Sequence, residues 1–337
     1  MARVALVVSG GSSKGAFAVG VAQRLREKLD VHFDIVAGTS TGSLVAPLVV
    51  TGEFGVLEQL YTTFSARNLI MLRQPLDMVR TGSVFDMSAL RTVLEDTYTE
   101  GRTQQILASP MQMFITTVQL ESGRTTYFHS GPEPTRDPDC DYVRIARRKD
   151  LIDAVFASSM QPVLMLPVRI GGASYVDGGV RKTVAMGVAI DNGATDVYAV
   201  VLSAENEAAD AGPFDGLVPI LKRTIDLFGD EIVLAETRRA QFHVDTINYV
   251  AAVQRRLQGA VPDGAAGVTA AFHPAGSSSP LAGTPVARVY LIRPTDKLLA
   301  DSLKFSLDDM RRMVRLGRER VDAMWPGVQP QGALPVV

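Results

Sequence analysis

The hydrophobic pattern of the first fifty residues predicts two strand–loop–helix units. Val4–Val8 is a short, continuously apolar run, as expected for a strand buried on both faces, and Ala16–Leu29 has apolar residues at helical spacing. A second apolar run, Phe33–Ala37, leads into a turn at 38–43 and then into an apolar helix that ends near Thr51. Repeated strand, loop and helix predict a parallel sheet with crossover helices.

The next part of the chain, from about 53 to 110, loses this rhythm and is predicted to be a helical insertion. Two interpretations stay open for its apolar residues: ordinary packing within the insertion, or an adaptable cover over an apolar site. Strand character returns at Gln112–Leu120, followed by a hairpin with its turn at Ser122-Gly123, and another strand ends at "YVDGG", residues 175–179. The apolar residues in question are Met71, Leu72, Leu76, Met78 and Val79.

The pattern divides the chain into an α/β domain over 1–210 and a largely helical extension over 211–337. We expect the extension to pack on the same domain, with a late strand at 286–293. Residues 259–285 are rich in Gly, Ala, Ser and Pro and predict a flexible loop. The last helix, Ser306–Trp325, carries an apolar stripe that we expect to dock onto the domain, the alternative being a helix on a membrane surface.

Composition and charge narrow the possible partners and compartments. The 337 residues carry a formal charge of −2, so nothing global indicates a nucleic-acid partner. The single cysteine, Cys140, has no second cysteine for a disulfide or a thiolate metal site. The N-terminus shows no signal-peptide pattern, and no apolar run approaches the ~20 residues of a membrane span. We therefore expect a cytoplasmic protein, with peripheral contact at a membrane left open; the sequence indicates no oligomeric state.

The glycine-rich stretch "SGGSSKGAF", residues 9–17, is typical of a loop that binds an anion through backbone amides at a helix N-terminus. It is not a Walker A loop, because Lys14 is followed by Gly15 and not by Ser or Thr. It also lacks the G-x-G-x-x-G spacing of a dinucleotide loop, because Gly10 and Gly11 are adjacent. A nucleotide phosphate is therefore the least favoured anion.

The turn "GTSTGS", residues 38–43, fits the G-x-S-x-G nucleophile elbow between a strand and a helix. In such a turn the glycines relieve crowding, and the Ser40 hydroxyl is lifted clear of the backbone. The alternative is a plain small-residue turn leading into a helix. Because parallel neighbouring strands end at one sheet edge, we expect the loop Gly10–Ser12 beside Ser40, where its amides could stabilise an oxyanion.

A serine nucleophile also needs a base, and the sequence favours Asp177. None of the four histidines, His32, His129, His243 and His273, has a recognisable catalytic context. Asp177 ends a strand and precedes two glycines, so its carboxylate could take the serine proton directly, although a turn-forming aspartate has the same pattern. An α/β-hydrolase triad is disfavoured, because its elbow usually follows several strands and Ser40 follows only two.

Together, "SGGSSKGA", "GTSTGS" and "YVDGG" in this order resemble the motifs of the patatin-like phospholipases. The stretches "GSVFDMSALRTVL" (82–94) and "DAVFASSMQPVLMLPVRIGGASYVDGG" (153–179) are similar as well, so the resemblance covers about residues 3–203. Two departures stand out. Ser12 occupies a position where the family usually has glycine, and Arg181-Lys182-Thr183-Val184 replaces the usual Asn and Pro after D-G-G.

The resemblance implies a three-layer α/β/α fold with a mostly parallel sheet and lipid ester hydrolysis without metal or cofactor. It implies Ser40 as nucleophile, Asp177 as base, and the amides of Gly10, Gly11 and Ser12 as oxyanion hole. The leading hypothesis for the substrate is a phospholipid or lysophospholipid ester, and transient contact with a membrane surface stays open. Two alternatives stay open: an acyltransferase that uses the same acyl-serine, and a lipid-binding protein whose catalytic geometry has lapsed.

Overall fold

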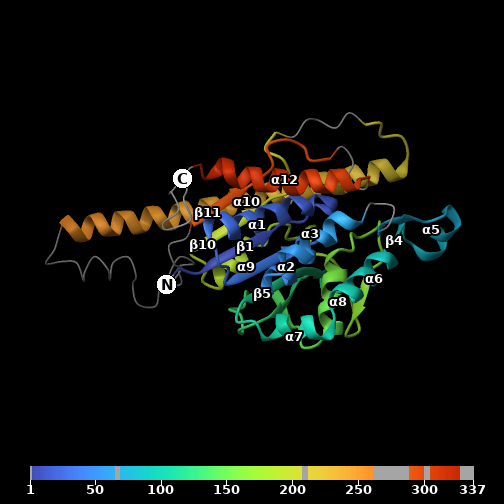
Figure 1. The fold of residues 1–337 in the computed structure, drawn as a ribbon, viewed down its shortest axis with the longest axis horizontal. Coiled ribbons are helices and arrows are strands. Elements are labelled where there is room, and N and C mark those ends of the chain that lie inside the picture. The colour runs from blue at the N-terminus through green and yellow to red at the C-terminus, as the bar shows by residue number, and fades with distance from the viewer. Residues whose placement is uncertain (1, 65–68, 207–211, 261–287, 300–303, 327–337) are drawn as a thin grey trace.

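A mixed sheet forms the centre of the molecule in the computed structural model, which describes residues 2–64, 69–206, 212–260, 288–299 and 304–326 (Figure 1). Its strands lie in the order β11-β10-β1-β2-β5-β6-β7, with β9 paired to β5 and β8 paired to β9. The five strands from β11 to β5 are mutually parallel, whereas β6 and β9 run antiparallel to β5. The strands are β1 (Val4–Val8), β2 (Ile35–Thr39), β5 (Gln112–Gln119), β6 (Thr125–Ser130), β7 (Cys140–Arg144), β8 (Val168–Ile170), β9 (Ala173–Asp177), β10 (Asp196–Val200) and β11 (Arg288–Ile292).

Helices cover both faces of this sheet, as the alternating side chains of β1 require. Leu6 and Val8 belong to a core shared with α1 (Gly15–Leu29), α2 (Thr41–Val50) and α12 (Leu307–Met324). Ala5 and Val7 belong to a second core shared with α9 (Met186–Asp191) and α10 (Leu217–Ala260). The predicted three-layer α/β/α architecture is therefore confirmed.

Several local predictions are confirmed by the described elements. The β5–β6 hairpin turns at Gly123, whose φ is 68°, and the late strand is β11. The last helix, α12, begins at a Ser306 capping box and buries its apolar stripe against the domain. Within the expected loop 259–285, residues 259 and 260 complete α10 and the others lie outside the described residues.

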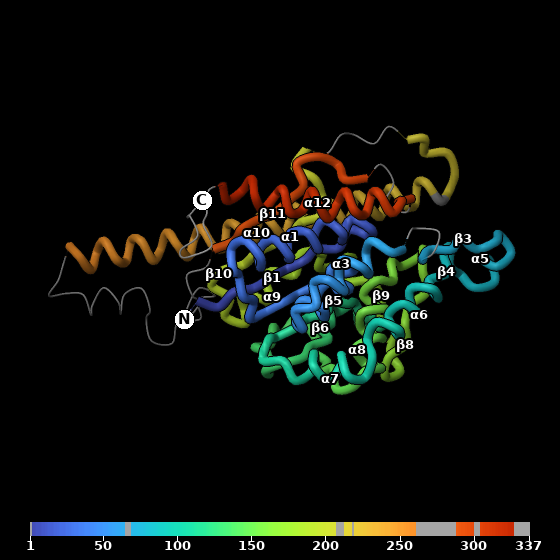
Figure 2. The backbone as a smooth tube through the Cα atoms, viewed as in Figure 1, coloured from blue at the N-terminus to red at the C-terminus, as the bar shows by residue number. Residues whose placement is uncertain are grey.

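In its described part, the insertion contains several helices and one pair of very short strands that the pattern did not predict. β3 (Met71–Leu72) pairs with β4 (Phe85–Asp86), and α5 (Pro75–Thr81) connects them. This β3–α5–β4 unit projects at one end of the long axis (Figure 2). Four of its apolar residues are exposed and not packed as expected for an ordinary insertion: Met71 is 44%, Leu72 66%, Leu76 80% and Val79 84% exposed. Met78 is half-buried. The other helices described for residues 53–64 and 69–110 are α3 (Phe54–Thr63), α6 (Ser88–Thr97) and α7 (Glu100–Ala108).

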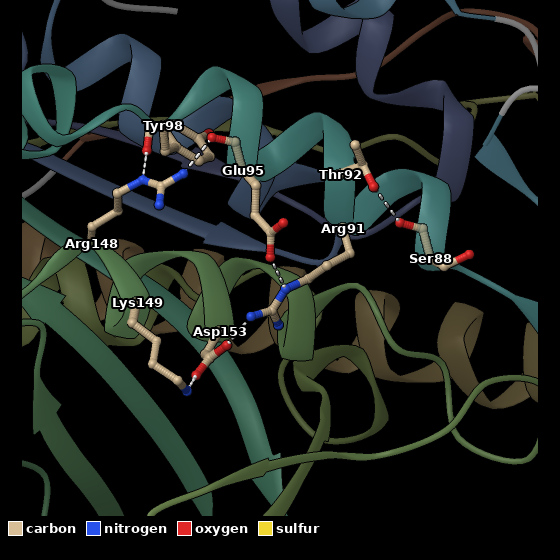
Figure 3. A network of polar contacts seen from close by, with 8 residues as sticks. All are labelled: Ser88, Arg91, Thr92, Glu95, Tyr98, Arg148, Lys149 and Asp153. Carbon is tan, nitrogen blue, oxygen red and sulfur yellow. Dashed lines mark hydrogen bonds and ion pairs between the residues drawn. The ribbon is translucent and has the colours of Figure 1, made fainter.

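A polar network holds α6 against α8 (Arg148–Ser158), as Figure 3 shows. Arg91 of α6 bonds to Glu95 at 3.0 Å and to the buried carboxylate of Asp153 at 2.7 Å. Arg148 donates to the backbone oxygens of Glu95 and Tyr98, at 2.6 and 2.5 Å. Charge-assisted bonds to a buried carboxylate hold their partners firmly in place. These bonds therefore hold α6 in place against α8.

Candidate active site

The sheet topology brings the glycine-rich loop, the "GTSTGS" turn and the end of β9 to one edge. β1 and β2 are parallel, and Val8 lies opposite Gly38, so the loop after β1 and Ser40 leave the sheet side by side. β5 follows β2 in the sheet, and Asp177 at the end of β9 pairs with Thr117 of β5. Three motifs separated by up to about 170 residues therefore meet around one point.

The backbone at Ser40 has the strained conformation of a nucleophile elbow. Its φ of 56° and ψ of −121° lie outside the regions that L residues ordinarily occupy. Gly42 passes so near β1 that a Cβ there would lie 2.2 Å from the Val8 carbonyl oxygen, and a Cβ on Gly38 would be equally close to that of Gly42. The glycines are thus required by close packing, which favours the elbow over a plain small-residue turn.

Asp177 lies within hydrogen-bonding reach of the candidate nucleophile. Its carboxylate accepts hydrogen bonds from the Ser40 side chain and, at 2.7 Å, from the Gly179 backbone N–H. Burial raises the pKa of Asp177 to about 6, although both hydrogen bonds act in the opposite direction. A carboxylate with a pKa near the working pH is well suited to accept a serine proton.

The loop Gly10–Ser12 lies beside Ser40, and its three amides are not equivalent. The Gly10 N–H donates to the Thr183 carbonyl oxygen at 3.2 Å, so it is already engaged. In the described part of the chain, the Gly11 N–H meets no acceptor. A Cβ on Gly11 would lie 2.7 Å from Leu202 Cβ, so only glycine fits there. Ser12 has a φ of 52°, the left-handed conformation for which glycine is usual.

A cavity of about 510 Å³ opens from these residues, within the size range of small-molecule sites. Ser12, Ser40 and Asp177 line its polar end. The remaining walls are largely apolar and come from both helical layers and the insertion. They include Leu90, Val93 and Leu94 of α6 together with Ile225, Phe228 and Ile232 of α10. Such a cavity can hold an apolar chain with its polar end at Ser40.

The described histidines have other surroundings. His32 is exposed and pairs with Asp30, and His243 belongs to α10. His129 is buried in β6 near the Phe114 and Tyr142 rings, and burial lowers its pKa. His273 lies outside the described residues.

Two hydroxyl residues near the site were missed by the sequence analysis. Ser158 accepts a hydrogen bond from the Ser40 N–H at 2.9 Å and donates to the Thr116 carbonyl at 2.7 Å, which fixes the elbow to β5. Thr183 bonds to the glycine-rich loop, as described above. Ser158 lies in the family-like stretch 153–179, a signal that could have found it, whereas Thr183 lies where the chain departs from the family pattern.

Comparison with known proteins agrees with this geometry. Residues 6–190, more than half of the chain, match the patatin-like phospholipase family. The uncharacterized protein YjjU of Escherichia coli is 24% identical over 199 residues, which cover 59% of this chain and 51% of that protein. An uncharacterized NTE family protein of Mycobacterium bovis is 24% identical over 213 residues, 63% of this chain and 51% of that protein. The chain spans about half the length of these relatives.

The crystal structure of VipD from Legionella pneumophila aligns with 96% of this chain and 66% of its own, at 12% identity and a TM-score of 0.40. The family match is the stronger finding, and it extends from β1 to α9. The chain therefore belongs to the patatin-like phospholipase family. Members of this family are generally hydrolases of phospholipids and other esters.

Proposed function

We propose that the protein is a serine lipid acyl hydrolase that cleaves carboxylic esters of phospholipids or lysophospholipids. The observation that carries the proposal is the hydrogen bond from the Ser40 side chain to the buried Asp177 carboxylate, at the polar end of an apolar cavity. The chain binds its substrate by burying the acyl chain between α6 and α10, with the ester carbonyl at Ser40.

The proposed reaction has two steps. Ser40 Oγ attacks the ester carbonyl while Asp177 accepts its proton, and the amides of Gly11 and Ser12 stabilise the oxyanion. The expected third donor, the Gly10 N–H, is already bonded to the Thr183 carbonyl. Collapse of this intermediate releases the alcohol, which takes the proton, and leaves an acyl-serine. Asp177 then activates water, which attacks the acyl group and releases the fatty acid and Ser40. The residues need no metal for these steps.

The proposal is tested by exposing the full chain to a fluorophosphonate probe and to phosphatidylcholine and lysophosphatidylcholine. Covalent labelling at Ser40 with fatty acid release supports the hydrolase. Labelling that occurs while added alcohol becomes acylated and no free acid forms supports an acyltransferase. Absence of both labelling and turnover overturns the proposal and leaves a lipid-binding protein.

We also propose that the strained backbone at Ser12 is needed to aim its amide. Ser12→Val should lower kcat at least about tenfold, because a β-branched residue strongly disfavours the left-handed conformation and shifts the backbone. Esterase kinetics and thermal unfolding of this variant provide the measurement. Asp30→Val is the matched control: Asp30 has a φ of 50° at the end of α1, so it should lose similar stability without losing kcat. Equal effects on kcat would contradict the prediction.

We further propose that the β3–α5–β4 unit makes transient contact with a membrane surface. The protein would then be cytoplasmic and associate peripherally with the membrane. The unit joins the cavity directly, since Ile70 before it and Met87 after it line the wall. Its charges are balanced, with Arg73 bonded to Asp86 at 3.0 Å and Arg80 to Asp77 at 3.2 Å. No helix in the described ranges could itself span a bilayer.

The double variant Leu76→Asp/Val79→Asp should lower cosedimentation with phosphatidylcholine vesicles at least about fivefold, because it removes exposed apolar contacts and adds charge. Hydrolysis of a short soluble p-nitrophenyl ester should change less than about twofold. Leu257→Asp, in the last turn of α10 and 43% exposed, is the control and should bind vesicles as the wild type does. Unchanged binding of the double variant would refute membrane contact by this unit.

A further inference from the structure

Residues 182–184, directly after the Asp177 turn, bond to all three elements of the candidate site. The Lys182 carbonyl accepts a hydrogen bond from Thr39 Oγ1 at 3.1 Å, next to Ser40. The Thr183 carbonyl accepts from the Gly10 N–H at 3.2 Å, and Thr183 Oγ1 donates to the Gly179 carbonyl at 3.0 Å. The position of this segment therefore fixes the elbow, the glycine-rich loop and the aspartate turn relative to one another.

The segment is held in turn by α10. Glu236 Oε2 accepts a hydrogen bond from the Val184 N–H at 2.7 Å, and the same carboxylate also bonds to the Thr183 backbone. Val184 is buried in the core that includes Val233 of α10, one turn before Glu236. The contact between α10 and residues 183–184 is thus both polar and apolar.

Placing the Glu236 carboxylate in this environment costs free energy of folding, which is unexpected for a residue whose only role is packing. Burial raises the pKa of Glu236 to about 7, while the bonds to Val184 and the charge of Lys182 act in the opposite direction. Desolvating a carboxylate costs free energy, and an apolar side chain would fill the same space without that cost. What the carboxylate adds is a strong, directed acceptor for a backbone amide.

We propose that Glu236 is a positioning residue that holds residues 182–184, and through them the Gly10 loop and the Asp177 turn, in the reactive arrangement. α10 lies beyond the family match at 6–190, so this chain completes its active site with its own C-terminal extension. We call the contact between Glu236 and residues 182–184 the clamp. It lies in the segment where the chain departs from the family's usual Asn and Pro. The inference rests on the proposed hydrolase function.

Three full-chain variants test this role in hydrolysis of p-nitrophenyl butyrate. Glu236→Ala should lower kcat about 30-fold and change KM less than about threefold, because small misplacements of reacting groups are costly and the cavity walls remain. Glu236→Gln keeps an acceptor oxygen for Val184 and should recover at least about a third of the wild-type kcat. Glu231→Ala, at an exposed position of α10, should match the wild type.

Two further measurements separate positioning from a general loss of folding. Rates are normalised to the folded fraction from thermal unfolding, and hydrogen exchange is followed in peptides that contain 9–12 and 177–184. Faster exchange in both peptides of Glu236→Ala supports the clamp. A normalised kcat equal to that of the wild type, no rescue by Gln, or unchanged exchange would overturn it. Failure of the wild type to react with a fluorophosphonate would instead refute the hydrolase, and the exchange result would still report whether the clamp exists.

Discussion

Ser40→Ala should lower kcat/KM for phospholipid and short-chain esters by at least about 10⁴-fold, which corresponds to about 5 kcal/mol of transition-state stabilisation. The hydroxyl is the atom that forms the acyl intermediate, and no other group replaces it. Fatty acid release and fluorophosphonate labelling measure the effect. The variant should fold normally, because alanine keeps the Cβ and the backbone N–H that bonds to Ser158.

Ser159→Ala is the matched control for this prediction. Ser159 lines the same cavity, but its hydroxyl donates to the Val155 carbonyl at 3.0 Å and is not bonded to Asp177. Its loss should change kcat/KM by less than about threefold. A Ser40→Ala protein that keeps a tenth of the wild-type activity, or one that the fluorophosphonate still labels as fully as the wild type, would show that Ser40 is not the nucleophile.

The parts of the fold that could be predicted are those set by short-range periodicity. β1, α1 and the β5–β6 hairpin follow from apolar spacing and from the turn at Ser122-Gly123. β7 was missed because "CDYVR" has only one fully buried residue, so alternation and length gave no signal. The β3–β4 pair was missed because two-residue strands have no period at all.

The parts of the site that could be predicted are those whose chemistry is local. Strained turns need glycines near the strained residue, so the turn around Ser40 and the loop Gly10–Ser12 can be recognised in the sequence. The left-handed backbone at Ser12 could be located because serine stands there in place of the family's usual glycine. Glu236 could not be found this way. It bonds to the backbone of a segment about 50 residues away in the chain, from a 44-residue helix whose face toward Val184 is set only by tertiary packing.

Asp177→Asn should abolish activity nearly as fully as Ser40→Ala, and the wild-type pH profile should report the same carboxylate. Because burial raises the pKa of Asp177 to about 6, kcat/KM should fall about tenfold per pH unit below pH 6 and level off above it. The profile is measured with a soluble ester whose own ionisation does not change over this range. A midpoint near 4 would mean that the carboxylate is not desolvated in the working enzyme.

The same substitution should make the protein more stable at neutral pH. In the unfolded chain an aspartate has a pKa of about 3.9, so the native state binds more protons between about pH 4 and 6. The free energy of unfolding therefore falls as the pH rises through this interval, and the full cost of the buried charge is present above pH 6. Asn removes that cost, so Asp177→Asn should gain on the order of 2 kcal/mol at pH 8 and nothing below pH 4.

Urea unfolding of both proteins at pH 4, 6 and 8 measures this difference. Asp308→Asn, whose side chain is 93% exposed, is the control and should show no such gain. An Asp177→Asn variant that is less stable than the wild type at pH 8 would mean that the hydrogen bonds from Ser40 and Gly179 outweigh desolvation. A gain confined to high pH would instead mean that the fold carries an unfavourable charge at the one position where the proposed reaction needs a base.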